Sequence, residues 1–504
     1  MQKRIVAFQQ HGLVDWRYDG TGPVSEVWRH EKSVTRLILE AEMRPDARGM
    51  KSLRQAGSRV LLILLLVILP SAAYANGIYR NGVGAKAMAL GGADVAWADD
   101  PLGAMAANPA GLGFLKDATL QLSLAGAFAD GRFTNPANTD GQLDTLAGIV
   151  PDVAFAVPLG ASPVTLGFAI TPSSLMNADW RYLDTPGGLD GVTTYGLQRH
   201  RSEIIVLRSA VGLGVSLGPN VSLGGSVGLI YNNNSLEAPY IFQSQPVLKG
   251  FKTLLNLGTD GFGVNGSVGV LARLHETLQV GITYTTQTTI DSHGDASGNA
   301  SAQLISLGPP FSGARPDFHY DAEVKTVFPQ MVSGGMSWKA HPRLRLGLQI
   351  DWINWSDAFD RLPIKLTNGT NADINALVGS SSMDDVVPLK WEDRVVYRAG
   401  LEYALSDNLA LRGGYSYGKS PVPASTLIPL TAAILEHTVA AGVGYRTGRY
   451  QVDVAYQWDL PTTQRVGVSE LRAGEYSNSK VDVGIHWVGV TLSIAFENAG
   501  RVAK

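Results

Sequence analysis

The sequence predicts an all-β protein, a 14-stranded antiparallel transmembrane β-barrel of a bacterial outer membrane, with an N-terminal hatch made of short helical pieces. Three observations predict this class. Apolar and polar residues alternate over most of the chain, and the connections between the alternating segments are short and long in turn. In addition, only 17% of the 504 residues are charged and 57 are glycine, whereas soluble domains carry about 25% charged residues and ~7% glycine.

The composition also excludes several kinds of site. The chain has no cysteine, so it holds no disulfide, no thiolate metal site and no cysteine nucleophile. Its net charge of −3 gives no basic footprint, and we expect no nucleic-acid partner. The nine histidines form no H-E-x-x-H motif, and no G-x-S-x-G elbow occurs. We therefore expect no metal, no cofactor and no enzymatic activity.

The chain begins with a segment that we interpret as a processed leader. The apolar run 60–69 follows basic residues and precedes the small-residue sequence Ser71-Ala-Ala-Tyr-Ala75. Ten helical residues cover about 15 Å, half of the ~30 Å hydrocarbon core, so a membrane-spanning helix is not expected. The pattern instead predicts a signal peptide at residues 50–75, cleaved between Ala75 and Asn76. The alternative is a short buried helix.

The first 49 residues precede this signal. A signal peptide begins close to its basic region, so translation is expected to start at Met50 or, alternatively, at Met43. Residues 1–49 are then an over-extended or disordered leader. The exported chain, residues 76–504, has 429 residues.

Residues 76–116 do not alternate. They are rich in small side chains, and glycine and proline interrupt short helix-like pieces such as the one before Gly91 and Gly92. Small side chains let a backbone pack closely against a wall. This segment is therefore predicted to be a hatch, or plug, in front of the barrel.

From residue 117 to 496 apolar side chains recur at every second position, the period of half-buried strands. Leu344, Leu346 and Leu348, for example, alternate with Arg345 and Gly347. Fourteen such segments are predicted, at 117–130, 151–160, 162–172, 200–217, 219–235, 261–274, 276–290, 320–339, 342–355, 393–405, 407–417, 436–447, 449–458 and 482–496. A tail, residues 497–504, follows them.

The connections differ between the two ends of these segments. At one end they are short turns such as Gly218-Pro219-Asn220, whereas at the other end they are long. The predicted long loops cover 131–150, 173–199, 236–260, 291–319, 356–392, 418–435 and 459–481. Tyrosine and tryptophan gather at the segment ends. An even number of strands with this asymmetry is typical of outer-membrane barrels, whose closed wall leaves no backbone edge unpaired in lipid.

Several motifs occur in order along the chain. They are Gly84 to Gly92, Ala98-Asp99-Asp100-Pro101, Asn108-Pro109-Ala110-Gly111-Leu112, Phe328-Pro329-Gln330, Asp351 to Ser356, Tyr397 to Tyr403, Leu411 to Tyr415 and Ser420 to Pro423. With them the chain resembles the FadL/TodX family of outer-membrane transporters for long-chain fatty acids and other hydrophobic molecules. The resemblance covers nearly the whole exported chain.

The resemblance implies passive, hatch-gated uptake through the outer membrane by a monomer whose partners are a hydrophobic ligand, such as a long-chain fatty acid, and membrane lipid. Extracellular loops capture the ligand, and movement of the hatch and a kinked third strand let it escape sideways. The hatch motif is Asn108, Pro109 and Ala110. Pro109 fixes its own φ and pushes Asn108 away from helix, so we expect a rigid bend whose Asn108 amide can bond to the barrel wall or to a loop. The alternative is an ordinary loop tip.

Two sets of residues are candidate ligand contacts. Four arginines are expected to face inward and could bind a ligand carboxylate: Arg208, Arg345, Arg398 and Arg412. Alternatively, they pair with the lumen acids Asp351, Glu402 or Asp453, because buried charges need partners. Apolar residues of the predicted loops could form a capture groove or could pack between loops: Leu175, Met176, Ile241, Phe242, Phe251, Leu254 and Leu255.

Two other functions stay open at this point. A general diffusion porin would need an open polar lumen, which a plug at 76–116 would fill. An outer-membrane lipid-acting enzyme would need a serine, histidine and acid set on the outer wall. The sequence does not distinguish a fatty acid from an aromatic hydrocarbon or another lipid as the ligand.

Overall fold

The computed structural model describes residues 5–9, 12–16, 77–144 and 147–496. The chain divides into two units, Met1–Ser71 and Ala72–Lys504. In the first unit, β1 (Ile5–Gln9) and β2 (Gly12–Trp16) pair as an antiparallel hairpin. The predicted signal peptide, the C-terminal tail and the rest of the predicted leader lie outside the described residues. No helix of the described residues is long and apolar enough to cross a membrane.

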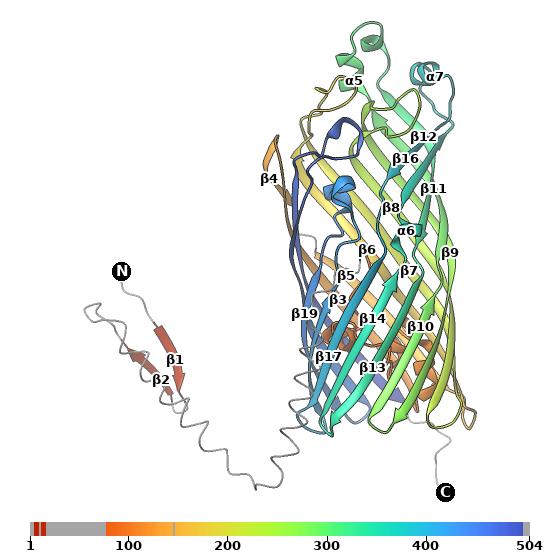
Figure 1. Cartoon of the computed structure of the whole chain (residues 1–504), viewed down its shortest axis with the longest axis vertical. Helices are drawn as coiled ribbons and strands as arrows, with labels where there is room; N and C mark the ends of the chain where they lie inside the picture. The colour runs from red at the N-terminus through yellow and green to blue at the C-terminus, as the bar shows by residue number, and fades with distance from the viewer. Residues whose placement is uncertain (1–4, 10–11, 17–76, 145–146, 497–504) are drawn as a thin grey trace. The chain divides into compact units, whose positions relative to one another are not determined.

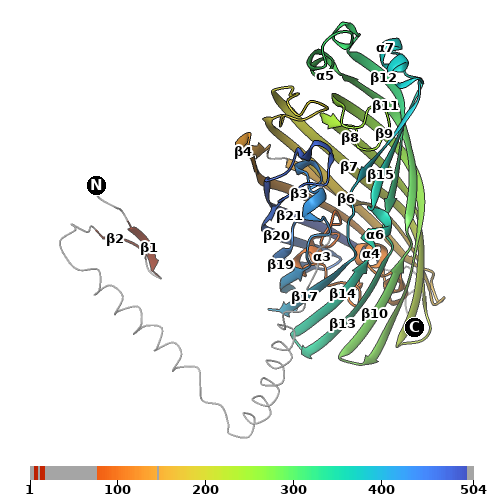
Figure 2. The ribbon, with the colours of Figure 1, turned by 45° about the horizontal axis from the view of Figure 1, so that its top comes forward.

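The second unit is a closed antiparallel barrel (Figures 1 and 2). Its strands are β3 (Ala118–Asn135), β4 (Asn138–Leu143), β5 (Ala147–Pro158), β6 (Val164–Leu183), β7 (Leu197–Ser216), β8 (Val221–Ile241), β9 (Lys252–His275), β10 (Leu278–Thr285), β11 (Thr288–Asn299), β12 (Asp317–Phe328), β13 (Met331–His341), β14 (Leu344–Ile353), β15 (Arg361–Thr367), β16 (Met383–Pro388), β17 (Arg394–Ala404), β18 (Leu409–Tyr417), β19 (His437–Thr447), β20 (Tyr450–Arg465) and β21 (Lys480–Phe496).

These segments fill fourteen positions in the wall. Five positions are each made of two consecutive segments: β4 with β5, β10 with β11, β12 with β13, β14 with β15, and β16 with β17. Both members of such a pair bond to the same neighbouring position of the wall. For example, β10 and β11 both pair with β9, and β12 and β13 pair with β11 and β10, which share one position. The prediction of a fourteen-stranded antiparallel barrel is confirmed.

At the end away from the short turns, the strands extend beyond the predicted segments. The predicted loop 131–150 is mostly strand, because β3 reaches Asn135 and β4 follows after a turn. Likewise β8 continues to Ile241 and β9 starts at Lys252, inside the predicted loop 236–260. These loop predictions were too long. The strand extensions carry polar side chains on their outer face, such as Asp295 and Lys325, so the outward positions there are not the apolar ones that mark a strand facing lipid.

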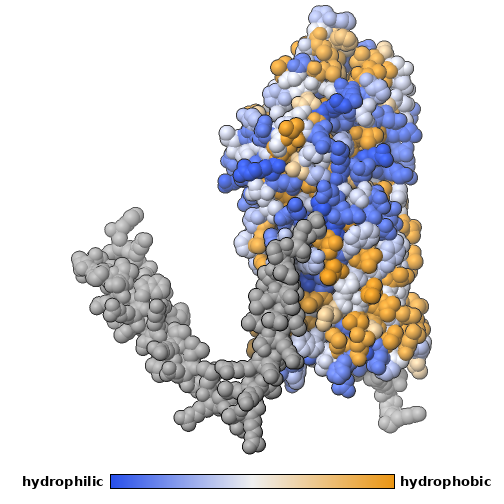
Figure 3. Space-filling model, viewed as in Figure 1, coloured by the Kyte–Doolittle hydropathy of each residue, from blue (hydrophilic) through white to orange (hydrophobic). Residues whose placement is uncertain are grey.

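On the half of the strands next to the short turns, exposed apolar side chains are numerous and mark the part of the wall that meets lipid. They include Leu124, Ile149, Val264, Ile282 and Tyr445. Figure 3 shows hydrophobic residues gathered on the lower part of the visible face, a region rich in hydrophilic residues above them, and further hydrophobic residues at the top. An apolar outer band of this kind fits a hydrocarbon layer.

Short helices complete the unit. In the N-terminal segment (residues 77–117) they are α3 (Ala85–Ala89), α4 (Pro101–Ala106) and η1 (Pro109–Phe114). Between strands they are α5 (Ser301–Ser306), η2 (Phe311–Gly313), α6 (Trp355–Ala358), α7 (Ala372–Val378), η3 (Ala424–Thr426), η4 (Pro429–Thr431) and η5 (Arg472–Gly474).

The N-terminal segment lies inside the ring of strands (Figure 2). Helix α3 packs on β19 and β20, α4 on β5 and β6, and η1 on β7 and β8. Bare glycine backbone on the wall makes this close packing possible. A Cβ placed on Gly224 would lie 2.3 Å from the Ala110 amide nitrogen, and one on Gly414 would lie 2.1 Å from that of Gly91. Sterically, neither position admits a larger residue while the segment stays in place.

Candidate functional site

The Asn108-Pro109-Ala110 motif forms a bend between α4 and η1. Asn108 is fully buried and caps η1 by accepting a hydrogen bond from the Ala110 N–H at 3.1 Å. Its amide donates to the Val95 carbonyl at 3.0 Å and to the Val270 carbonyl on β9 at 3.2 Å. The bond to the barrel wall that the sequence suggested is therefore present.

Ion pairs anchor the N-terminal segment near the short turns. Lys86 bonds to Asp100 at 3.0 Å and contacts Asp99, and Arg345 of β14 bonds to Asp99 at 2.7 Å. The Arg345 guanidinium also lies over the Trp97 ring, 4.2 Å from its centroid. Together these charged side chains give the lumen a polar floor at that end of the barrel.

Three cavities lie above this floor. The first, which we call the upper apolar cavity, has a volume of about 150 Å³. Its lining is mainly apolar and includes Ile204, Leu236, Phe359, Trp391 and Tyr476. An apolar cavity of this size can hold a benzene ring.

The second cavity, of about 140 Å³, is the gap cavity, and its lining includes Tyr79, Leu175 and Trp180. The third, of about 170 Å³, is the polar cavity, and its lining includes Asp94, Arg208 and Arg398. Met176 lines both the upper apolar cavity and the gap cavity, and Arg80 lines both the gap cavity and the polar cavity. The three cavities therefore adjoin one another in series.

Three of the four candidate arginines have acidic partners. Arg398 bonds to Asp351 at 2.6 Å, and Arg412 bonds to Glu402 at 2.7 Å and to Asp453 at 2.6 Å. Arg345 pairs with Asp99, as described above. These pairs follow the alternative interpretation of the sequence, in which lumen acids neutralise the inward arginines.

Arg208 differs from the other three. It is buried, and it donates to neutral acceptors: Asn265 Oδ1 at 2.9 Å, Ser226 Oγ at 2.8 Å and the Met105 carbonyl at 3.2 Å. No carboxylate of the described residues lies within ion-pair distance of it. Two of its five N–H donors are left for another partner, and the side chain lines the polar cavity. Burial also raises the pKa of Asp94, in the same cavity, to about 7.

The wall is interrupted between its second and third positions. β5 pairs with β6 as far as Val153 opposite Ile170, and β4 pairs with β6 again only at Leu143 opposite Trp180. Beside Leu143, the Asp144 N–H donates to the Asp179 carbonyl of β6 at 2.8 Å. Between this bond and Val153, no backbone pairing of the described residues joins the two positions. β6 also has a bulge between Pro172 and Ser174 in its pairing with β7. This wall gap adjoins the gap cavity, which Leu175 and Trp180 line.

The candidate capture residues are not all in loops, contrary to the prediction. Leu175 and Met176 lie in β6, Leu254 and Leu255 in β9, and Ile241 ends β8. Those strands extend above the apolar band, where outward positions become polar, as Asn256 and Asp260 of β9 are. Met176 and Ile241 line the upper apolar cavity.

Only Phe242 and Phe251 of the candidates are loop residues, in the connection between β8 and β9. Both are buried in a cluster with Leu255, Phe318 and Tyr320. This is packing between loop and strands, the alternative interpretation of the sequence.

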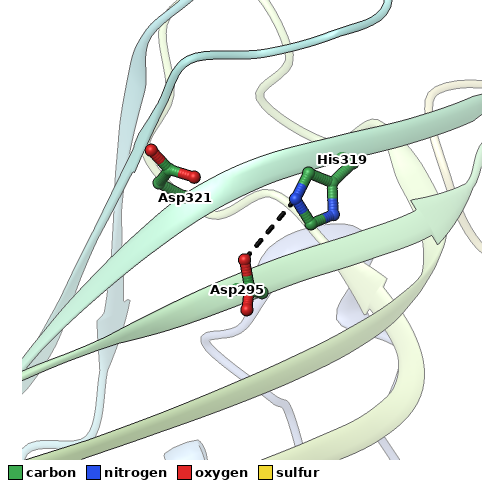
Figure 4. Close-up of side chains that lie close together, drawn as sticks. All are labelled: Asp295, His319 and Asp321. Atoms are coloured by element: carbon green, nitrogen blue, oxygen red, sulfur yellow. Dashed lines mark ion pairs between the residues drawn. The ribbon is translucent and has the colours of Figure 1, made fainter.

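One group of side chains outside the lumen could hold a metal ion: Asp295, His319 and Asp321, on β11 and β12 (Figure 4). His319 Nε2 lies 3.5 Å from Asp295 Oδ1, and Asn368 donates to Asp321 at 2.6 Å. All three residues are exposed, so water competes for each ligand position. The group lies apart from the cavities, and none of its members lines them.

Sequence reasoning missed several cavity residues. Phe359 and Trp391 stack with ring centroids 4.7 Å apart, beside Trp355. They come from the long connection 356–392, which was predicted to be loop, and the one tryptophan in it, Trp391, is the only signal there. Arg80 and Asp152 were also missed, since nothing in the sequence connects a residue before the barrel with one on β5.

This structure is a closed antiparallel barrel with an apolar outer band, a lumen occupied by the N-terminal segment, and cavities above the charged floor of that lumen. These features define a class, the β-barrel proteins of the outer membrane. Over residues 66–498 the chain matches the family described as "Outer membrane protein transport protein (OMPP1/FadL/TodX)". The chain belongs to this family, as the sequence motifs suggested, and its place is the outer membrane.

Solved structures share the fold. A FadL homologue of Pseudomonas aeruginosa is 15% identical, with a TM-score of 0.66 over 84% of this chain and 100% of that one. The toluene transporter TodX of Pseudomonas putida is 20% identical, with the same TM-score and coverage. The toluene transporter TbuX of Ralstonia pickettii is 17% identical, with a TM-score of 0.62 over 83% of this chain and 99% of that one.

A curated relative is an uncharacterized protein from the 5′ region of the phosphoenolpyruvate carboxykinase gene of Chlorobium limicola. It is 35% identical over 109 residues, which are 21% of this chain and 53% of the relative. The chain thus spans about half the length of this curated relative.

Proposed function

We propose that the protein is a monomeric outer-membrane transporter for the passive uptake of long-chain fatty acids, or of other molecules with a long apolar tail and a carboxylate. The ligand enters from outside, occupies the cavities in series and leaves sideways into the membrane. The N-terminal segment acts as the hatch that gates this route, with Asn108, Pro109 and Ala110 at its bend.

The cavities support a ligand with an apolar tail. Each methylene group that leaves water for an apolar site contributes about 0.8 kcal/mol. The upper apolar cavity offers such a site, and Met176 connects it with the gap cavity. A single cavity of about 150 Å³ suits one ring, whereas a long chain requires the cavities together.

Arg208 is the observation that carries the proposal of a carboxylate. It is a buried cation that lines the polar cavity and has no acidic partner among the described residues. A buried charge without a counter-charge is costly, and a ligand carboxylate would supply the missing charge. A hydrogen bond to a charged group contributes about 1.5–3 kcal/mol, which corresponds to roughly a 10- to 100-fold preference for an acid over an equivalent neutral ligand.

The test compares ligands that differ only in their polar end. Binding of a long-chain fatty acid and of the alcohol of equal length to the purified protein is measured by displacement of a fluorescent fatty acid. We expect the acid to bind about 10- to 100-fold more tightly, and Arg208→Met to remove most of this difference. Arg181→Met, which changes an exposed arginine of β6, serves as the matched control. Equal affinity for acid and alcohol in the unaltered protein would contradict the proposal.

A second candidate ligand is a neutral aromatic hydrocarbon. Two structural neighbours are titled toluene transporters, and the upper apolar cavity has aromatic side chains, Phe359 and Trp391, in its lining. In the same assay a neutral aromatic transporter would bind toluene more tightly than the fatty acid, and Arg208→Met would leave toluene binding unchanged.

A general diffusion porin is the third possibility, and an outer-membrane lipid-acting enzyme the fourth. The N-terminal segment in the lumen argues against free diffusion of polar solutes, and the members of the family are described as transport proteins. Swelling of liposomes in sugar solutions measures open diffusion. Fast sugar entry without any fatty-acid binding would favour the porin.

A further inference from the structure

The two edges of the wall gap are joined by a side chain that belongs to neither of them. Arg80, in the N-terminal segment, donates to both carboxylate oxygens of Asp152 on β5, at 2.7 and 3.2 Å. The same guanidinium donates to the Pro172 carbonyl on β6 at 3.2 Å. Asp152 lies next to Val153, the last β5 residue paired with β6. Arg80 therefore spans the gap where it begins.

The contact is withdrawn from solvent. The side chains of Arg80 and Asp152 are 5% and 0% exposed. A two-pronged arginine–carboxylate contact fixes direction as well as distance. Water does not weaken a buried pair as it weakens an exposed one, so this pair can hold the two edges in one position.

The backbone beside Arg80 closes the gap further along. Tyr79 forms an isolated antiparallel bridge with Ser174, on the part of β6 that lacks a partner on the β5 side. Tyr79 and Arg80 also both line the gap cavity and the polar cavity. The start of the N-terminal segment thus lies between the cavities and the part of β6 that has no partner on the β5 side.

The gap opens at the level of the lipid. On β5, Ile149 lies within the unpaired stretch and is 77% exposed. On β3, Phe128 pairs with Ala147 of the same stretch and is also exposed. Large apolar side chains on the outer face indicate that this part of the wall meets hydrocarbon.

We propose that Arg80 and Asp152 form an ionic latch that holds the N-terminal segment across the wall gap, and that its release opens the gap cavity to the membrane. The inference rests on the proposed function in one respect, namely that a ligand uses this opening. The latch itself is a property of the wall and can be tested without any ligand.

Removal of one partner would leave a buried charge and could prevent folding. The test therefore uses two double variants. In Arg80→Met with Asp152→Leu both charges are replaced by apolar side chains, and in Arg80→Asp with Asp152→Arg the two charges are exchanged. The matched control is Arg315→Met with Asp373→Leu, which removes an exposed two-pronged pair, with distances of 2.9 and 3.2 Å, away from the cavities.

The first measurement reports opening of the gap. Because the chain has no cysteine, Ser173→Cys on β6 gives a single reactive thiol beside the bulge. Each protein is placed in lipid nanodiscs, its folding is checked by heat-modified gel mobility, and labelling by a lipid-soluble maleimide is timed. We expect at least tenfold faster labelling in the apolar double variant, and a rate close to that of the unaltered pair in both the charge-exchanged variant and the control.

The second measurement, release of a bound fluorescent fatty acid into the nanodisc lipid, separates the latch from the proposed function. We expect release to quicken in the apolar variant as labelling does. Faster labelling in a protein that binds no fatty acid would support the latch and refute the proposed function. Fatty-acid binding with unchanged labelling in the apolar variant would overturn the latch and leave the function standing. Equal acceleration in the control would also overturn it.

Discussion

Substitution of Asn108 by alanine tests how the N-terminal segment is held in the lumen. The Asn108 side chain is fully buried against the bare backbone of Gly269, where a Cβ would lie 2.1 Å from its Oδ1 atom. It makes three hydrogen bonds, one to the wall at Val270 and two within the segment, to Val95 and Ala110. Alanine removes all three and leaves those backbone groups without their partner.

The expected loss follows from these bonds. Each contributes about 1 kcal/mol net, and loss of a helix cap alone costs about 1 kcal/mol. The three bonds together give about 3 kcal/mol. Because each 1.4 kcal/mol is a factor of ten in an equilibrium constant, undocking of the segment should become roughly 100-fold more frequent. The barrel strands should keep their stability, since their ladders do not involve this side chain.

Hydrogen exchange read by mass spectrometry measures this directly. Peptides from residues 77–117 should exchange about 100-fold faster in Asn108→Ala, and peptides from the strands at their usual rate. Asn135→Ala is the control, because Asn135 also bonds to backbone N–H groups but in the turn between β3 and β4. Unchanged exchange in 77–117, or equal acceleration over the whole barrel, would refute this reasoning.

Two more predictions concern charged groups. Burial raises the pKa of Asp94 to about 7 from its ordinary value of 3.8; the docked segment therefore favours the protonated acid, and docking should weaken as the pH rises from about 4 to about 7. Hydrogen exchange of residues 77–117 at several pH values should follow this trend, and Asp94→Asn should abolish it. Lys252, fully buried, bonds to Asp184 at 2.6 Å and to Glu475 at 2.8 Å. Lys252→Met leaves two buried acids without their cation and should lower the free energy of unfolding by about 3–5 kcal/mol in denaturant titrations. The control Lys390→Met removes the cation of an exposed pair and should leave the free energy of unfolding unchanged.

The barrel could be predicted where lipid imposes a pattern on the sequence. Within the apolar outer band, each outward position must be apolar, and each inward position is free to be small or polar. Strands such as β14 and β20 therefore show a two-residue period. Above the apolar outer band, water lies on the outer face of the wall. β12 still alternates there, with polar residues such as His319 outward and apolar residues such as Tyr320 inward. β11 carries Asp295 outward but has mostly small or polar residues inward, so its alternation is weak and its upper part was predicted to be loop.

The pairing of the arginines was predictable only in part. Glu402 lies directly opposite Arg412 in the register of β17 and β18, and two inward charges of opposite sign on neighbouring strands are expected to meet. Arg208 lies opposite Thr171 and Ile230, so its lack of an acid also follows once the register is known. The sequence alone does not fix that register.

The contact that we propose as a latch could not be predicted from the sequence. Arg80 and Asp152 are 72 positions apart, on elements of different kind, and their contact depends on how the N-terminal segment turns within the lumen. Alternation places Asp152 on the inner face, but no periodicity extends through residues 77–117. The only hint in the sequence is that an arginine, Arg80, lies ahead of the first strand of the barrel.

For a ligand of the proposed kind, the energetics of the two ends of the lumen favour a sideways exit over one through the floor. A route through the floor would pass the charged side chains of Lys86, Asp99 and Arg345, and would return the ligand to water. Ten methylene groups that leave an apolar cavity for water forfeit about 8 kcal/mol, before any ion pair is broken. Through the wall gap the same groups pass from an apolar cavity into hydrocarbon, so this free-energy cost of exposure to water nearly vanishes. What opposes the sideways route is then local, namely the Arg80–Asp152 contact and the backbone bridge at Tyr79, and a barrier made of so few contacts can open without unfolding the barrel.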